Sequence, residues 1–509
     1  MVSPLLLTLL LMQAAPAAAE APKTPDAKTA EAKPAAKEAD KEEPPVVTHH
    51  EIVIGGRTLK YSATTGMMPL RDAKGDLQAH IFFMAYTLDG VSDKLKRPLM
   101  FSFNGGPGSA SVWLHLGAVG PKRVVMLPDG EMPAPPFHLA DNEYTWLDQT
   151  DLVFIDPVGT GYSRAEKPEL NKEFWSLKGD IQSVGEFIRL YLTRYERWTS
   201  PLFLVGESYG TTRAAGLSGY LIDRGIAFNG IVLVSSILNF ETADFAKGND
   251  LPYVLYLPTY TATAWYHHKL APDLQADLEK TLREVETWAS TKYAEALAKG
   301  DQLSAAERAD VIDKLSRYTG LEKRFIDYSN LRVAIFPFTK ELLRDQRRTV
   351  GRIDSRFKGI DESAATASPE YDPSIAAIRP PYTTTFNNYV RSDLGYKTDL
   401  EYYILGEGLN GPWTWGGPGY AGYPDTSEDL RQAFSKNPYM KLFVASGHFD
   451  LATPFYATEY TLSHMGLDPS LRGNISTGEY EAGHMVYLDT SQLAKLKKDV
   501  SAFLAGALK

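Results

Sequence analysis

The chain has 509 residues, of which 44% are hydrophobic and 23% charged, proportions typical of a globular protein with a large core. Its formal net charge of −10 argues against a general nucleic-acid binder, and the lack of Cys excludes disulfides, thiolate metal ligands and a Cys nucleophile. Because a bacterial secreted protein and a cytosolic one both fit a chain without Cys, composition leaves the compartment open.

The N-terminus has the pattern of a targeting segment. Residues 4–12 form an apolar core of signal-peptide length, and Ala17–Ala19 offers a small-residue cleavage site, so we expect a signal peptide over residues 1–19. Residues 20–45 contain only Ala, Lys, Glu, Pro, Thr and Asp, which favours a disordered linker. No later stretch has membrane-spanning length. We therefore expect a periplasmic or secreted protein, with no stable membrane insertion after signal cleavage.

Short apolar runs then alternate with helix-compatible stretches such as Leu177–Tyr195. The later runs are rich in Val, Ile, Leu and Phe without clean alternation, as in parallel strands covered on both faces. This alternation predicts an α/β fold with a mostly parallel central sheet. The expected strands are Glu51–Ile54, Thr58–Ser62, His80–Leu88, Leu99–Asn104, Asp151–Asp156, Leu202–Gly206, Gly230–Ser235 and Lys441–Ser446.

The alternation stops between about residues 240 and 436. Leu274–Lys299 and Ala305–Tyr318 have helical periodicity, and Glu401–Asp425 is a Gly/Tyr/Trp-rich loop. We predict a mostly helical cap insertion over residues 240–436. The two parts of the core are then residues 46–239 and 437–509.

Gly206-Glu207-Ser208-Tyr209-Gly210 follows an apolar strand and precedes a helix-compatible stretch. Glycines allow a sharp turn that lifts the Ser hydroxyl above the C-terminal edge of a parallel sheet. This context predicts that Ser208 is a nucleophile. The alternative is a tight strand-to-helix turn whose Ser caps the helix.

A nucleophilic Ser needs a base and an orienting acid. Asp450 leaves the end of a late strand, at the sheet edge where Ser208 is expected, although it could also cap the following helix. His484 follows it in a loop after another strand-like segment, whereas His464 falls in an apparent helix as a surface or packing residue. We predict Asp450 as the acid and His484 as the base, with His448 in a loop near the site.

Five blocks resemble, in order, the signature blocks of the serine carboxypeptidase family. The resemblance spans most of the chain and implies an α/β-hydrolase fold and a catalytic triad of Ser208, Asp450 and His484. It also implies release of C-terminal residues from peptides with a free C-terminal carboxylate, without a metal or organic cofactor. The blocks are Asn104-Gly105-Gly106-Pro107-Gly108-Ser109, Asp156-Pro157-Val158-Gly159-Thr160-Gly161-Tyr162-Ser163, Gly206-Glu207-Ser208-Tyr209-Gly210, Gly447-His448-Phe449-Asp450 and Gly483-His484-Met485.

The resemblance also assigns the surrounding roles. Gly106 and Tyr209 match the residues whose backbone N–H groups form the oxyanion hole. The predicted substrate-binding residues are Asn104, Gly105, Glu207 and Met485, of which Asn104 and Glu207 match the binders of the substrate's terminal carboxylate. Gly105 and Gly106 give a backbone that a carbonyl can approach closely. The alternatives are an Asx turn for Asn104 and a buried structural ion pair for Glu207.

Two positions depart from the family pattern. Ala118 stands where the family carries a second Glu that shares a proton with the first, and Ser102 stands where it carries a Trp. Losing the coupled carboxyl pair removes one reason for an acidic pH optimum. We considered His115, three residues before Ala118, as a replacement positive charge. The family's structural cysteines are absent too, as would suit a bacterial secreted branch.

Two other functions stay open at this stage. An esterase or acyltransferase would use the same triad on another acyl substrate. A noncatalytic binding scaffold would keep the fold without turnover. The sequence gives neither the side-chain specificity nor the oligomeric state.

Overall fold

The computed structural model describes residues 42–409, 411–416 and 422–509. The predicted signal peptide and most of the predicted linker therefore lie outside the described residues. Of the linker only residues 42–45 are described, and they are exposed and without regular secondary structure. Residues 43–509 form one compact unit, and all the features described below lie in it.

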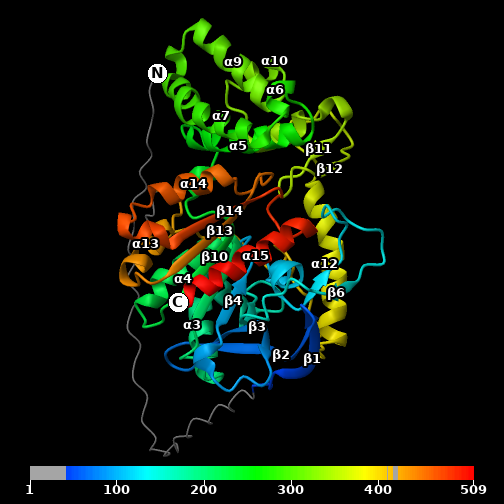
Figure 1. Cartoon of the computed structure of the whole chain (residues 1–509), viewed down its shortest axis with the longest axis vertical. Helices are drawn as coiled ribbons and strands as arrows, with labels where there is room; N and C mark the ends of the chain where they lie inside the picture. The colour runs from blue at the N-terminus through cyan, green and yellow to red at the C-terminus, as the bar shows by residue number, and fades with distance from the viewer. Residues whose placement is uncertain (1–41, 410, 417–421) are drawn as a thin grey trace, which may run out of the picture. The chain divides into compact units, whose positions relative to one another are not determined.

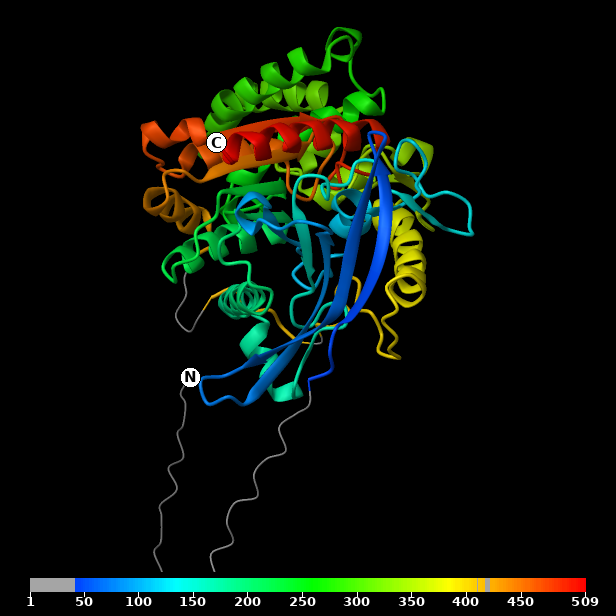
Figure 2. The same ribbon diagram turned by 60° about the horizontal axis from the view of Figure 1, so that its bottom comes forward.

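The unit is built on a ten-stranded sheet among the described residues (Figure 1). Neighbouring strands from β7 to β14 are parallel, while β1, β2 and β3 add an antiparallel extension that Figure 2 shows as three long strands side by side. Each of the eight expected strands lies in one of these, which confirms the mostly parallel α/β sheet. The strand order is β1 (Val46–Ile54), β2 (Arg57–Arg71), β3 (Leu77–Leu88), β7 (Asp151–Ile155), β4 (Leu99–Phe103), β9 (Leu202–Ser208), β10 (Gly230–Ser236), β13 (Lys441–Gly447) and β14 (Ile475–Tyr480), with β8 (Arg164–Ala165) beside β3.

Helices cover both faces of the sheet. Because successive side chains of a strand point to opposite faces, each central strand contributes to two buried clusters. On β3, Ile81 and Phe83 belong to one buried cluster and Phe82 and Met84 to the other. The first cluster includes residues of α3 (Leu177–Arg194), α4 (Tyr209–Ile222) and α13 (Ser427–Lys436). The second includes residues of α1 (Val112–Leu114), η2 (His115–Val119), α12 (Pro373–Ser392) and α15 (Thr490–Ala507).

Between β10 and β13 the regular structure is almost entirely helical, and α5 to α11 contribute to a separate buried cluster. The predicted helix Ala305–Tyr318 is confirmed, with a capping box from Ser304 and a left-handed Gly320 at its end. The predicted helix Leu274–Lys299 is broken into α6, α7, a π turn and α8. The helices are α5 (Leu251–Tyr266), α6 (Pro272–Gln275), α7 (Leu278–Trp288), α8 (Ala294–Lys299), α9 (Ala305–Thr319), α10 (Lys323–Tyr328) and α11 (Ile335–Glu341).

Helix α12 has no counterpart among the predicted elements. Pro380 and Pro381 lie in its middle and oppose helix formation. Tyr382, Phe386 and Tyr389 are buried against the sheet, so tertiary packing overrides the local signal. Helix α12 therefore packs on the sheet and does not join the α5–α11 cluster, so the cap limits 240–436 stay a prediction. None of the described helices is long and apolar enough to cross a bilayer.

Candidate active site

Three parallel strands bring the predicted triad to one edge of the sheet. Strand β9 ends at Ser208, while Asp450 and His484 follow the ends of β13 and β14. Strand β10 lies between β9 and β13, and its Ser236 is in register with Ser208. Asp450 and His484 lie 242 and 276 positions after Ser208 in the sequence. Because parallel strands end at the same edge of a sheet, all three residues lie at that edge.

Ser208 occupies a strained turn between β9 and α4. Its φ is +60° and its ψ −133°, a region that non-glycine residues rarely adopt. A Cβ on Gly206 would clash with the carbonyl oxygen of Gly210, so the turn requires glycine there. The Ser208 side chain makes no capping hydrogen bond to α4, which rules against the alternative of a helix cap.

Asp450 and His484 form a buried pair. The Nδ1 atom of His484 lies 2.7 Å from Oδ2 of Asp450, and the Thr453 hydroxyl donates to the same oxygen at 2.7 Å. Asp450 Oδ1 accepts from the backbone N–H groups of Ala452 and Thr453, so the carboxylate is both the partner of the imidazole and the acceptor of its own turn. Burial alone would lower the pKa of His484, but the charge and hydrogen bond of Asp450 outweigh it and raise that pKa.

The backbone of His484 is tied to the neighbouring elements. Its N–H donates to Ile353 at 2.7 Å, and the Ser235 hydroxyl of β10 donates to its carbonyl at 2.5 Å. Within the part of the chain that the structure describes, neither Oγ of Ser208 nor Nε2 of His484 has a hydrogen-bond partner. Both atoms are thus available to a substrate.

The other two candidate histidines lie elsewhere. His464 is exposed at the end of α14 (Phe455–His464) and bonds the Tyr460 carbonyl of its own helix, as predicted for a surface residue. His448 is buried directly after β13. Its Nε2 lies 2.8 Å from Oε2 of Glu479 on β14, so its partner is Glu479 and not Asp450 or His484.

The backbone of Gly105, the residue before the predicted oxyanion-hole residue Gly106, lies against the backbone of Tyr209. A Cβ on Gly105 would clash with the backbone N of Tyr209 and lie 2.6 Å from that of Gly210. Tyr209 opens α4, and the first N–H groups of a helix have no partner within the helix. The turn after β4 and the start of α4 therefore face one another without an intervening side chain.

Glu207 and Asn104 are buried together next to Ser208. The Asn104 amide donates to Oε1 of Glu207 at 2.7 Å, and its oxygen accepts from the N–H of Leu114 at 3.0 Å. Asn104 thus bonds ten residues ahead and is not an Asx turn. No Lys or Arg among the described residues pairs with Glu207, so the structural ion pair is not formed either. Burial raises the pKa of Glu207 to about 7, against the opposing charge of His484 and the nearby Tyr487 and Asn104 side chains.

Aromatic side chains crowd Gly117, the residue before Ala118. A Cβ on Gly117 would clash with the Tyr487 ring and lie 2.7 Å from the Tyr382 hydroxyl. The Tyr487 hydroxyl is buried and close enough to Glu207 and Asn104 to interact with both. Sequence reasoning missed Tyr487, because it belongs to none of the signature blocks.

The suggestion that His115 supplies a positive charge is wrong. Its side chain is fully buried beside Phe154, its Nε2 lies 2.7 Å from the Tyr86 hydroxyl, and burial lowers its pKa to about 3. It is therefore neutral at ordinary pH. Met485 is buried in the cluster that includes α15 residues, and its predicted contact with substrate stays a prediction.

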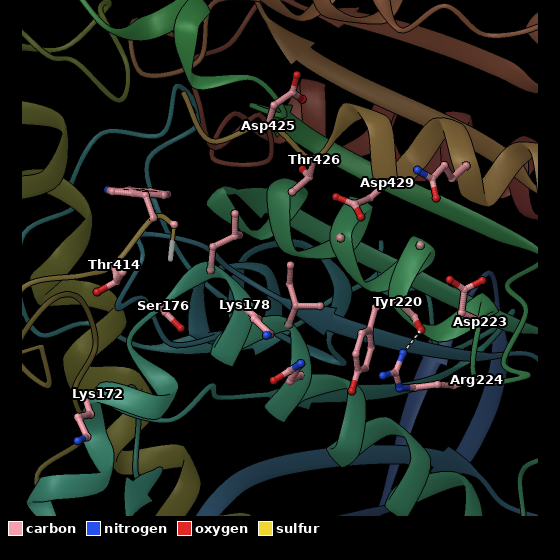
Figure 3. A pocket seen from close by; sticks show the side chains of 18 residues that line it. Lys172, Ser176, Lys178, Tyr220, Asp223, Arg224, Thr414, Asp425, Thr426 and Asp429 are labelled. Atoms are coloured by element: carbon pink, nitrogen blue, oxygen red, sulfur yellow. Dashed lines mark hydrogen bonds between the residues drawn. The ribbon is translucent and has the colours of Figure 1, made fainter. Parts of the chain in front are cut away.

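A groove of about 550 Å³ opens between α3, α4 and α13 (Figure 3). Lys178, Tyr220 and Asp429 line it, together with Trp415, whose ring lies 5.8 Å from that of Tyr209. Among the described residues that line this groove there is no predicted site residue, although Trp415 contacts the Tyr209 ring.

The comparisons with known proteins agree with this geometry. A family model described as serine carboxypeptidase matches residues 57–486. The pheromone-processing carboxypeptidase KEX1 of Saccharomyces cerevisiae is 33% identical over 155 residues, 28% of this chain and 20% of that protein. Serine carboxypeptidase-like 51 of Arabidopsis thaliana is 28% identical over 191 residues, 35% of this chain and 38% of that protein. The matches thus span between a fifth and two fifths of these relatives.

The solved structure of KEX1(delta)p, a prohormone-processing carboxypeptidase from Saccharomyces cerevisiae, is similar in fold. The TM-score is 0.50 at 18% identity, covering 87% of this chain and 91% of that one. Together with the strand order, this likeness confirms the α/β-hydrolase fold.

Proposed function

Since the chain belongs to the serine carboxypeptidase family, we propose that it is a serine-type carboxypeptidase that releases C-terminal residues from peptides. The observation that carries this proposal is the buried hydrogen bond between Asn104 and Glu207, the residue that precedes Ser208. It accompanies the buried pair of Asp450 and His484. A buried carboxyl whose pKa is raised can stay protonated and donate a hydrogen bond to a terminal carboxylate, which supports recognition of a free C-terminus.

In the proposed reaction Ser208 Oγ attacks the carbonyl carbon of the last peptide bond while His484 Nε2 takes the hydroxyl proton. Asp450 holds the imidazole in the required tautomer and stabilises its charged form. The backbone N–H groups of Gly106 and Tyr209 stabilise the oxyanion. His484 then gives its proton to the leaving amine, and the acyl-enzyme forms. Water, deprotonated by His484, releases the shortened peptide.

Glu207 selects the free C-terminus through its raised pKa. As a neutral acid it donates a hydrogen bond to the substrate's carboxylate, and as an anion it repels that carboxylate. Asn104 helps to hold the substrate's terminal carboxylate in place. No step of this mechanism uses a metal or an organic cofactor.

The test is digestion of a peptide library followed by mass spectrometry. Loss of single C-terminal residues, and protection of the same peptides by a C-terminal amide, supports the proposal. Hydrolysis of esters without cleavage of any peptide would favour the esterase or acyltransferase. Failure of a fluorophosphonate probe to label Ser208 would favour the noncatalytic scaffold.

The remaining expectations are proposals of the same kind. Residues 1–19 act as a cleaved signal peptide, residues 20–45 as a linker and residues 240–436 as the cap of a bacterial, periplasmic or secreted enzyme. The apolar core at residues 4–12 supports this localisation. N-terminal sequencing should find the mature protein starting near Glu20, and Met1 retained on a cytosolic pool would overturn it.

A further inference from the structure

Two buried charges connect the turn after β4 with the start of α4. Arg213 lies one turn after Tyr209 in α4, and its Nη1 donates to the Asn104 carbonyl at 2.6 Å. Its Nε donates to Oδ2 of Asp180 in α3 at 2.8 Å. The hydroxyl of Tyr209 donates to the same oxygen at 2.9 Å. Three hydrogen bonds thus link the four residues in the order Asn104, Arg213, Asp180 and Tyr209, and we call them the Arg213 network.

All members of the Arg213 network are buried. Arg213 is 1% exposed, Asp180 3% and Tyr209 1%, and the guanidinium lies 5.1 Å from the ring centres of both Phe103 and Tyr209. Taking two charges out of water costs more than their attraction commonly returns, so such a pair adds geometric definition rather than reliable stability. Arg is suited to this, because its planar group donates in several fixed directions.

The Arg213 network joins the two backbone segments that the proposed function assigns to the oxyanion hole. Gly105 and Gly106 follow Asn104, and Tyr209 supplies the facing N–H group. The two segments belong to different elements and touch through backbone atoms. An oxyanion hole stabilises charge only when its donors are held at fixed positions before the reaction.

We propose that Asp180 and Arg213 are positioning residues that set the spacing of the two oxyanion-hole N–H groups. The proposal rests on the proposed function for the roles of Gly106 and Tyr209. It extends that function to two residues outside the signature blocks. Neither side chain touches the substrate.

The test compares two buried ion pairs of the same protein. Arg213→Lys keeps a charge but loses the planar group, and Arg197→Lys does the same at a control pair. Arg197 Nη1 lies 2.6 Å from Oδ2 of Asp151, which starts β7 at the opposite edge of the sheet. Melting temperature, the rate of fluorophosphonate labelling of Ser208, and kcat and KM on an ester and on a free-acid peptide are measured for both.

We expect Arg213→Lys to lower the labelling rate and kcat by about 10- to 100-fold, equally on both substrates, with KM within about threefold. Arg197→Lys should keep kcat within about twofold while losing comparable thermal stability. Equal kcat in the two variants at temperatures where both are folded would overturn the proposal. If Arg213→Lys does not fold, Tyr209→Phe decides. It removes only the bond to Asp180, so we expect a several-fold lower kcat, and an unchanged kcat refutes the role.

The readouts separate this proposal from the proposed function. Labelling and ester hydrolysis do not depend on a peptide's terminal carboxylate. Wild-type protein that labels normally but cleaves no peptide contradicts the carboxypeptidase activity and leaves the comparison of Arg213 with Arg197 valid. Wild-type protein that does not label at all contradicts both.

Discussion

The side-chain amide of Asn104 donates a 2.7 Å hydrogen bond to Oε1 of Glu207, and both side chains are buried. This bond fixes one carboxyl oxygen against the turn after β4. The other, Oε2, is buried without a hydrogen-bond partner of standard geometry. A buried unpartnered oxygen is costly, so a ligand group that bonds it gains the free energy otherwise lost. Under the proposed function that ligand is the carboxylate of the substrate.

Removing any member of the proposed triad should abolish most turnover. Ser208→Ala, Asp450→Ala and His484→Ala should each lower kcat by about 10³-fold or more, because the three residues act as a unit. Circular dichroism checks that each variant folds. His464→Ala is the matched control and should keep full activity. The assignment of the base is wrong if His464→Ala is inactive while His484→Ala is not.

The pH dependence should be bell-shaped for peptides with a free carboxylate. His484 must be neutral to act as base, which sets the acid limb. Glu207 must be protonated to accept the substrate, and its pKa of about 7 sets the alkaline limb. Because the two groups interact, the two apparent pKa values belong to the pair.

Glu207→Gln should change the alkaline limb and leave the acid limb nearly in place. Gln keeps a donor without a charge, so the alkaline fall should flatten for free-acid peptides. Below its pKa of about 7 Glu207 is already mostly neutral, so its replacement removes little negative charge from beside His484 on the acid limb. Profiles of kcat/KM on a peptide, its amide and an ester check this. Identical profiles for wild type and variant would make Glu207 structural.

The strands, the turn at Ser208 and the pairing of Asp450 with His484 could be predicted because their signals are local. Gly206 and Gly210 flank Ser208 in five residues, and Asp450 and His484 each follow a recognisable strand end. Helix α12 could not be predicted, since Pro380 and Pro381 oppose it and only burial of its aromatic face explains it. Arg213 and Asp180 carry no motif either. Their partners are 29 to 109 residues away and come together through the packing of α3 and the turn after β4 on α4.

Tyr487 should serve free-acid substrates in place of the family's second carboxyl. Its hydroxyl lies beside Glu207, and burial raises its pKa well above 10, so it remains a neutral donor at ordinary pH. Tyr487→Phe should lower kcat/KM for free-acid peptides by about 10-fold, the value of one hydrogen bond to a charged group, and leave esters within about twofold.

The matched control for Tyr487→Phe is Tyr389→Phe. Tyr389 is also a buried tyrosine, and its hydroxyl pairs with Tyr86 at 3.1 Å instead. It should leave the ratio of peptide to ester hydrolysis unchanged. If both variants change that ratio equally, the effect of Tyr487 comes from packing.

Glu207 should also make the folded state less stable as pH rises. Its pKa is about 7 in the folded protein and near 4.5 when the chain is unfolded, so between these values the unfolded state binds fewer protons. Stability contributed by the protonated carboxyl is complete below pH 4.5 and is lost as pH rises through 7. The difference between the folded and unfolded pKa values of Glu207 corresponds to roughly 3 kcal/mol.

Glu207→Gln has no proton to lose. Its free energy of unfolding relative to wild type should therefore increase by roughly that amount between pH 4 and pH 8. Urea unfolding at both pH values measures this, with Glu131→Gln as the control at an exposed carboxyl. If the difference between Glu207→Gln and wild type is the same at both pH values, Glu207 ionises in the folded protein as it does in water, and the neutral donor required for carboxylate recognition is lost.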